Sequence, residues 1–157
     1  MDIKLIALDL DGTTLRSGSI LSAETKETLE KAIQKGVHVV IATGRTFTAL
    51  PKGIFEINGL EYVITSNGAR MAELSTMKNI YSNCADAEAM IRVKKLLSEN
   101  KQHPVEVFTE GRAYIDQSVY DDVRDNGSDF MDANYIINTR TPVTSVYDFL
   151  YDNKETI

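Results

Sequence analysis

An apolar run that ends abruptly in acidic residues lies near the N-terminus, and it constrains the fold more than any other stretch. Residues 4–15 read Lys-Leu-Ile-Ala-Leu-Asp-Leu-Asp-Gly-Thr-Thr-Leu. The continuous apolarity of residues 5–8 is typical of a parallel strand covered on both faces, and Gly12 lets the chain turn sharply out of the sheet. Asp9 and Asp11 follow at strand spacing, so their side chains start on one face if the backbone stays extended. We therefore expect a buried strand that delivers two carboxylates at its end.

The negative charges of two neighbouring carboxylates must be compensated by another group. Asp9 and Asp11 would repel each other and lose solvation, which is tolerated when a cation or a shared proton is present. A divalent metal site is the economical explanation. The competing interpretation is a polar turn after a strand, because Asp and Gly are common turn residues.

Two further strands are predicted downstream. Ser22 is a candidate N-cap for a crossover helix that stops near Gly36. Residues 37–42 then form a second buried strand, and residues 62–65 a third, which together predict a right-handed parallel unit. Since open parallel sheets bind ligands beyond the carboxyl ends of their strands, the residues that follow the second strand should lie beside Asp9.

Polar residues follow the second and third strands, and those after the second strand have two interpretations each. Thr43 and Gly44 could hold phosphate oxygens through a hydroxyl and backbone amides, or Thr43 could be an ordinary helix cap. Arg45 could orient a substrate phosphate or pair with a carboxylate, and the sequence leaves both open. Asn67, which precedes a glycine, is by itself a turn signal.

These motifs resemble those of the haloacid dehalogenase (HAD) superfamily of phosphohydrolases. Asp-x-Asp-Gly-Thr resembles its first motif, Val-Val-Ile-Ala-Thr-Gly-Arg its second, and Ile-Thr-Ser-Asn-Gly-Ala the Cof-like branch. The resemblance implies that Asp9 is the nucleophile, that Asp11 is the general acid and base, and that both hold Mg²⁺. It further implies that Thr43 and Gly44 bind the transferring phosphoryl group. Arg45 and Asn67 are then expected at the substrate rim.

The resemblance also implies an α/β fold in two parts. Residues 1–82 would form the N-terminal part of a Rossmann-like parallel core, and residues 83–157 part of an inserted α+β cap. In the cap we expect a helix capped by Asp86, strands over 104–109 and 112–116, and a helix over 143–152. An acidic run from Asp121 to Asp132 fits a solvated face better than a calcium loop.

Two pieces of the HAD site are not recognisable, namely the later Lys and the Gly-Asp-x-x-x-Asp-like motif. We therefore expect an N-terminal portion that ends inside the cap. In the family the first strand is central, so residues 5–8 would be uncovered here. An uncovered apolar edge tends to pair with another chain, which predicts a homo-oligomer through this edge or poor solubility.

Composition excludes several partners. The net charge of −6 and the lack of a basic stripe argue against nucleic acid, whose binding is driven by Lys and Arg. No apolar segment approaches the ~20 residues that span a bilayer, so no membrane partner and a cytoplasmic location are expected. Small phosphorylated metabolites are the expected partners.

Two functions remain after this reasoning. The first is a magnesium-dependent phosphomonoester hydrolase that works through an aspartyl-phosphate. The second is a non-catalytic HAD-like fragment that binds phosphate or a partner chain. A receiver domain is disfavoured, because receivers place the phosphorylated Asp after the third strand, where this chain has Ser66, Asn67 and Gly68.

Overall fold

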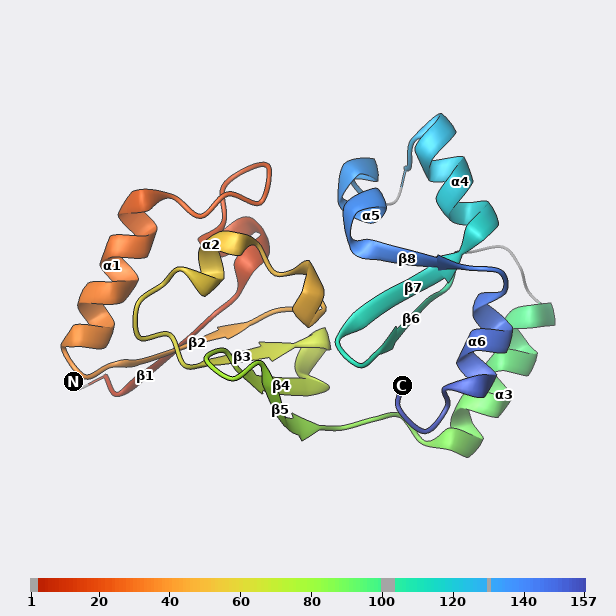
Figure 1. Cartoon of the computed structure of the whole chain (residues 1–157), viewed down its shortest axis with the longest axis horizontal. Coiled ribbons are helices and arrows are strands. Elements are labelled where there is room, and N and C mark those ends of the chain that lie inside the picture. The colour runs from red at the N-terminus through yellow and green to blue at the C-terminus, as the bar shows by residue number, and fades with distance from the viewer. Residues whose placement is uncertain (1–2, 100–103, 130) are drawn as a thin grey trace. The chain divides into compact units, whose positions relative to one another are not determined.

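A computed structural model describes residues 3–99, 104–129 and 131–157. The chain divides into two compact units, Met1–Asn83 and Cys84–Ile157. Figure 1 shows the helices and strands of both units, coloured along the chain. No helix of the described residues is long and apolar enough to cross a membrane.

The first unit is built on a five-stranded sheet in the order β1-β2-β3-β4-β5. The first three strands are parallel, as predicted, and the hairpin of the last two is antiparallel. The strands are β1 (Leu5–Leu8), β2 (His38–Ala42), β3 (Tyr62–Thr65), β4 (Arg70–Glu73) and β5 (Lys78–Ser82). The helices are α1 (Ala23–Gln34) and α2 (Lys52–Phe55), and the short turns are η1 (Leu10–Thr14), η2 (Phe47–Ala49) and η3 (Ser66–Gly68).

Helix α1 begins and ends where the sequence predicts. The Ser22 side chain accepts a hydrogen bond from the Thr25 amide, and Gly36 leaves the helix with a positive φ of 81°. Leu29 of α1, Ile54 of α2 and Ile41 of β2 belong to one apolar cluster. Ile41 and Ile54 are fully buried. This packing fixes the carboxyl ends of β1, β2 and β3 along one edge.

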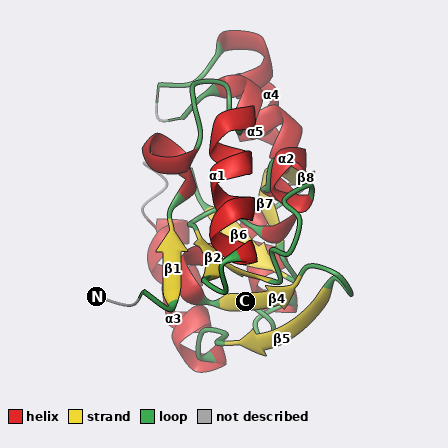
Figure 2. Cartoon of the chain, turned by 90° about the vertical axis from the view of Figure 1, so that its left-hand side faces the viewer, coloured by secondary structure: helices red, strands yellow, loops and turns green. Residues whose placement is uncertain are grey.

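The first strand differs from the expectation of a strand covered on both faces. Strand β1 lies at the end of the sheet and pairs with β2 (Figure 2). Its burial alternates, with Ile6 and Leu8 partly buried while Leu5 is 58% exposed. The expectation that residues 5–8 are uncovered therefore holds for Leu5 and Ala7 only, whereas Ile6 and Leu8 face the core, and β1 forms one edge of the sheet.

The second unit has a three-stranded sheet between two layers of helices. Its strands are ordered β6-β7-β8, with β6 and β7 antiparallel and β7 and β8 parallel. Val107 and Leu150 belong to the apolar cluster on one face, and Ile115 and Ile136 to the cluster on the other. The elements are α3 (Ala87–Glu99), β6 (Glu106–Thr109), β7 (Arg112–Asp116), α4 (Gln117–Asn126), α5 (Ala133–Thr139), β8 (Arg140–Val143) and α6 (Val146–Asp152).

Two predictions for this unit are wrong at a boundary, and the first is the strand expected over 104–109, which begins at Glu106. The expected helix over 143–152 begins at Val146, because Ser145 caps it and Asp116 accepts the Val146 amide. Pro142 instead lies in β8, a strand that the sequence did not indicate. A proline is tolerated there because β8 is at the end of the sheet and needs no amide on its open side.

The acidic run lies largely on helices that the sequence did not predict. Arg124 of α4 pairs with Asp121 and Asp125, both at 2.8 Å, on the exposed surface, and Asp132 caps α5 through the Tyr135 amide. The run therefore forms a solvated face with surface ion pairs.

A buried ion pair crosses β7. The Arg140 guanidinium donates through Nε to Oε1 of Glu106 at 2.8 Å and through Nη2 to Oε2 at 2.9 Å. The two side chains are 4% and 19% exposed. Because Ala113, the β7 residue opposite Arg140, is small and fully buried, the two long side chains can meet above it.

Candidate functional site

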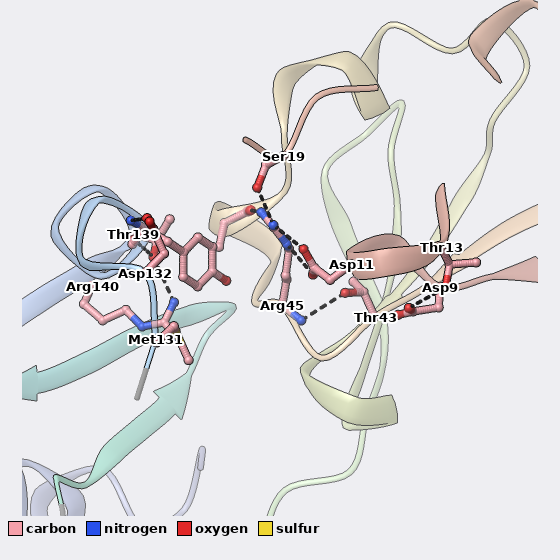
Figure 3. A network of polar contacts seen from close by, with 12 residues as sticks. Asp9, Asp11, Thr13, Ser19, Thr43, Arg45, Met131, Asp132, Thr139 and Arg140 are labelled. Atoms are coloured by element: carbon pink, nitrogen blue, oxygen red, sulfur yellow. Dashed lines mark hydrogen bonds and ion pairs between the residues drawn. The ribbon is translucent and has the colours of Figure 1, made fainter. Parts of the chain in front are cut away.

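The two N-terminal carboxylates leave β1 in different directions. Asp9 is extended, but η1 follows immediately, and Gly12 adopts a φ of 74° within it. Thr13 Oγ1 donates to Oδ2 of Asp9 at 3.2 Å, whereas the Asp11 carboxylate is turned toward Arg45 (Figure 3). Asp9 and Asp11 themselves have extended φ and ψ, but the turn η1 begins between them at Leu10, so the strand does not continue through both residues. The sequence therefore located both carboxylates but did not predict their directions.

Arg45 pairs with Asp11, which agrees with one of its two interpretations, whereas its contact with a substrate phosphate stays a prediction. Its Nε donates to Oδ2 of Asp11 at 2.8 Å and its Nη2 to Oδ1 at 2.6 Å. The Arg45 side chain is 8% exposed, while that of Asp11 is 57% exposed. The guanidinium thus lies behind the carboxylate and leaves it accessible. Hydrogen bonding to Arg45, opposed by partial burial, holds the pKa of Asp11 below its usual range, so Asp11 is a carboxylate at neutral pH.

Polar residues after β2 and β3 come together as the parallel topology predicts. The Thr43 amide donates to the Ile64 carbonyl, and the Asn67 amide to the Thr43 carbonyl. A Cβ on Gly44 would stand 2.8 Å from Oδ1 of Asn67, so only glycine permits this approach. Asn67 itself holds a positive φ of 54°, which asparagine tolerates.

Thr43 is buried and takes part in the turn that follows β2. Its Oγ1 accepts a hydrogen bond from the Arg45 amide at 3.2 Å, and no regular helix begins at Thr43. The hydroxyl therefore shapes the turn that presents Arg45 and does not cap a helix, and its contact with a phosphoryl group stays a prediction.

The oxygen donors near Asp9 and Asp11 are of the kind that binds a hard cation, but they are few. Among the described residues, no group of three or more His, Cys, Asp and Glu side chains is placed to hold a metal. The Asp9 carboxylate is exposed and the Asp11 carbonyl lies nearby in the chain, and both are oxygen donors of the kind that Mg²⁺ prefers. Both side-chain oxygens of Asp11 accept from Arg45, which turns this carboxylate toward the guanidinium.

Sequence reasoning missed two contacts that shape the site. Thr13 contacts Asp9, and the position of Thr13 in the Asp-x-Asp-Gly-Thr motif is the sequence signal that could have identified this contact. The Ser19 hydroxyl accepts from Nη2 of Arg45 at 2.6 Å. Gly18 is flanked by Ser17 and Ser19, and this polar stretch is the local signal that could have indicated a segment beside the site.

The comparison with protein families decides the identity of this arrangement. A family model described as haloacid dehalogenase-like hydrolase matches residues 6–157. The chain belongs to the haloacid dehalogenase-like hydrolase family. This confirms the family predicted from the motifs around Asp9, Thr43 and Asn67.

Members of the family with curated names include phosphatases. Phosphatase YwpJ of Bacillus subtilis is 35% identical over 117 residues, which are 74% of this chain and 40% of YwpJ. The 5-amino-6-(5-phospho-D-ribitylamino)uracil phosphatase YcsE of the same organism is 39% identical over 71 residues, 45% of this chain and 28% of YcsE.

A solved structure extends the similarity to the fold of both units. A haloacid dehalogenase-like hydrolase from B. subtilis superposes with a TM-score of 0.70 at 26% identity, covering 94% of this chain and 56% of that protein. The chain therefore matches well under two thirds of the length of these relatives.

Proposed function

We propose that this chain carries the nucleophile half of a magnesium-dependent phosphatase that acts on small phosphorylated metabolites through an aspartyl-phosphate. The observation that carries the proposal is the accessible Asp9 at the carboxyl end of β1, beside the turn after β2, in a chain of a hydrolase family. Residues 1–82 are assigned to the core and residues 83–157 to part of the cap.

The proposed roles follow the positions of the side chains. A carboxylate oxygen of Asp9 attacks phosphorus in line, and the bond from phosphorus to the leaving oxygen breaks. Asp11 gives a proton to the leaving oxygen and later takes one from the water that hydrolyses the aspartyl-phosphate. Pairing with Arg45 favours the carboxylate form of Asp11, which suits the second step; the first requires the protonated form.

The turn after β2 supplies the proposed phosphoryl contacts. Thr43 would donate its hydroxyl proton, and the Gly44 backbone can approach closely because it has no Cβ. Asn67 lies against Gly44 and is assigned to the rim. Arg45 is also assigned to the rim, and its guanidinium donates to Asp11 and Ser19.

Magnesium would be held by the Asp9 carboxylate and the Asp11 carbonyl, and it would neutralise charge on the phosphoryl oxygens. With one carboxylate, the site must keep more waters, so calorimetry should give a Kd that is roughly millimolar. Asp9→Asn should abolish the binding heat. Glu56→Gln, at an exposed acidic residue of the same unit, should leave it unchanged. A micromolar affinity would contradict this ligand set.

Self-association through β1 is the proposed oligomeric state. The open face of β1 presents Leu5, and Ile3 just before it is 50% exposed. Leu5→Lys should shift the chain toward monomer in sedimentation velocity, because a charged edge resists pairing. Met77→Lys replaces an apolar residue that is 55% exposed elsewhere in the same unit, so it is the matched control. A wild-type chain that stays monomeric at high concentration would contradict the proposal.

The alternative is a non-catalytic fragment that binds phosphate or a partner chain, and the short match to the relatives keeps it open. Steady-state hydrolysis of p-nitrophenyl phosphate with and without Mg²⁺ distinguishes the two functions. Turnover that depends on Mg²⁺ and on Asp9 supports the phosphatase. Phosphate binding without turnover supports the fragment.

A further inference from the structure

A short hairpin beside the site is held in a strained conformation. The backbones of Arg16 and Ile20 exchange two hydrogen bonds, of 2.9 and 3.4 Å. Between them, Gly18 and Ser19 both have positive φ, of 77° and 60°. A serine with positive φ is uncommon and strained, so a contact must favour it.

Arg45 provides that contact and binds Asp11 with the same nitrogen. Nη2 donates to Ser19 Oγ at 2.6 Å and to Asp11 Oδ1 at 2.6 Å, while Nε completes the fork to Asp11. Nη1 donates to the Ala49 carbonyl at 3.1 Å, which anchors the guanidinium to the segment after β2. Figure 3 shows the guanidinium between the Ser19 hydroxyl and the Asp11 carboxylate.

The planar guanidinium makes these contacts mutually dependent. Its donors have fixed relative directions, so the Asp11 carboxylate and the Ser19 hydroxyl cannot shift independently while both are bound. The hairpin and Asp11 also border the same hollow of about 930 Å³, lined in part by Gly12 and Leu15. Whatever enters this hollow meets the hairpin and the carboxylate together.

We propose that Arg45 is a positioning residue that couples the Arg16–Ile20 hairpin to the Asp11 carboxylate, so that the two are placed as one unit. The inference rests on the proposed function for its catalytic meaning, since Asp11 acts there on the leaving oxygen. The coupling itself is a property of the folded first unit and needs no turnover.

Backbone ¹⁵N relaxation of the full chain tests the coupling directly. In the wild type, the order parameters of Gly18 and Ser19 should be near the rigid value of about 0.85, and in Arg45→Met they should fall below about 0.6. Arg45→Lys should loosen the hairpin as well, because an ammonium cannot fork to Asp11 and bind Ser19 in one geometry. Residues 39–41 of β2 report whether the fold is retained.

Ser19→Ala and Asp11→Asn show whether the effect passes through Arg45. If it does, Ser19→Ala shifts the ¹³C signal of the Asp11 carboxyl, and Asp11→Asn lowers the order parameters at Ser19, since coupling is reciprocal. Arg16→Met removes an exposed arginine of the same hairpin and should do neither. An unchanged Asp11 signal in Ser19→Ala, or a rigid hairpin in Arg45→Met, overturns the proposal. Ser19→Ala keeps the test valid should Arg45→Met not fold.

Kinetics add a second measurement when the chain hydrolyses p-nitrophenyl phosphate. Misplacement of Asp11 in Arg45→Met should lower kcat on the order of 100-fold with little change in KM, because the substrate contacts remain. An unchanged kcat contradicts a positioning role. A wild-type chain without turnover refutes the proposed function alone, and the relaxation data still decide the coupling.

Discussion

Asp9→Asn is expected to remove the hydrolysis of p-nitrophenyl phosphate by roughly 1,000-fold or more, because loss of a catalytic nucleophile leaves only the remaining binding and electrostatic effects. The substitution keeps the volume of the side chain, and Thr13 can still donate to the remaining oxygen, so the fold should be retained. Initial rates at saturating Mg²⁺ measure the effect, and amide spectra of β2 and β3 check the structure.

Retained turnover in Asp9→Asn would refute Asp9 as the nucleophile. The variant also controls for contaminating phosphatase, since both preparations carry the same contaminants. Wild-type turnover no higher than that of Asp9→Asn would favour the non-catalytic alternative.

Arg140→Met is expected to destabilise the second unit by about 3–5 kcal/mol, because it leaves the mostly buried Glu106 carboxylate without its cation. Arg140 also stacks on the Tyr135 ring, 4.7 Å from its centroid, and donates to Thr139. Urea unfolding followed through the NMR signals of Tyr114, in the central strand, measures the change for this unit.

A matched control and a rescue test the physical reason. Arg124 also pairs with carboxylates, but on the surface, where solvent screens the pair, so Arg124→Met should destabilise the unit far less than Arg140→Met. Adding Glu106→Leu to Arg140→Met should recover much of the loss, because no unpaired charge remains buried. Similar costs for Arg140→Met and Arg124→Met would contradict the importance of burial.

Much of the fold follows from local sequence patterns. The apolar runs of β1 to β3, the Ser22 cap and the positive φ at Gly36 each depend on residues close in sequence, so their positions were predictable. Strand β8 was not, because a segment with Pro142 has a weak strand pattern, and only its position beside β7 makes it a strand.

The features of the candidate site also fall into those that the sequence predicted and those that it did not. The sequence by itself determined the family and which residues stand at the carboxyl ends of the strands, since parallel topology brings Asp9, Thr43 and Asn67 to one edge. The directions of the side chains were decided by tertiary structure. The Arg45 guanidinium reaches Asp11 and Ser19 across 34 and 26 residues, and no local spacing encodes such a contact. The exposure of Leu5 was likewise decided by which strands flank β1. The sequence pattern of an apolar strand does not distinguish a position at the centre of a sheet from one at its edge.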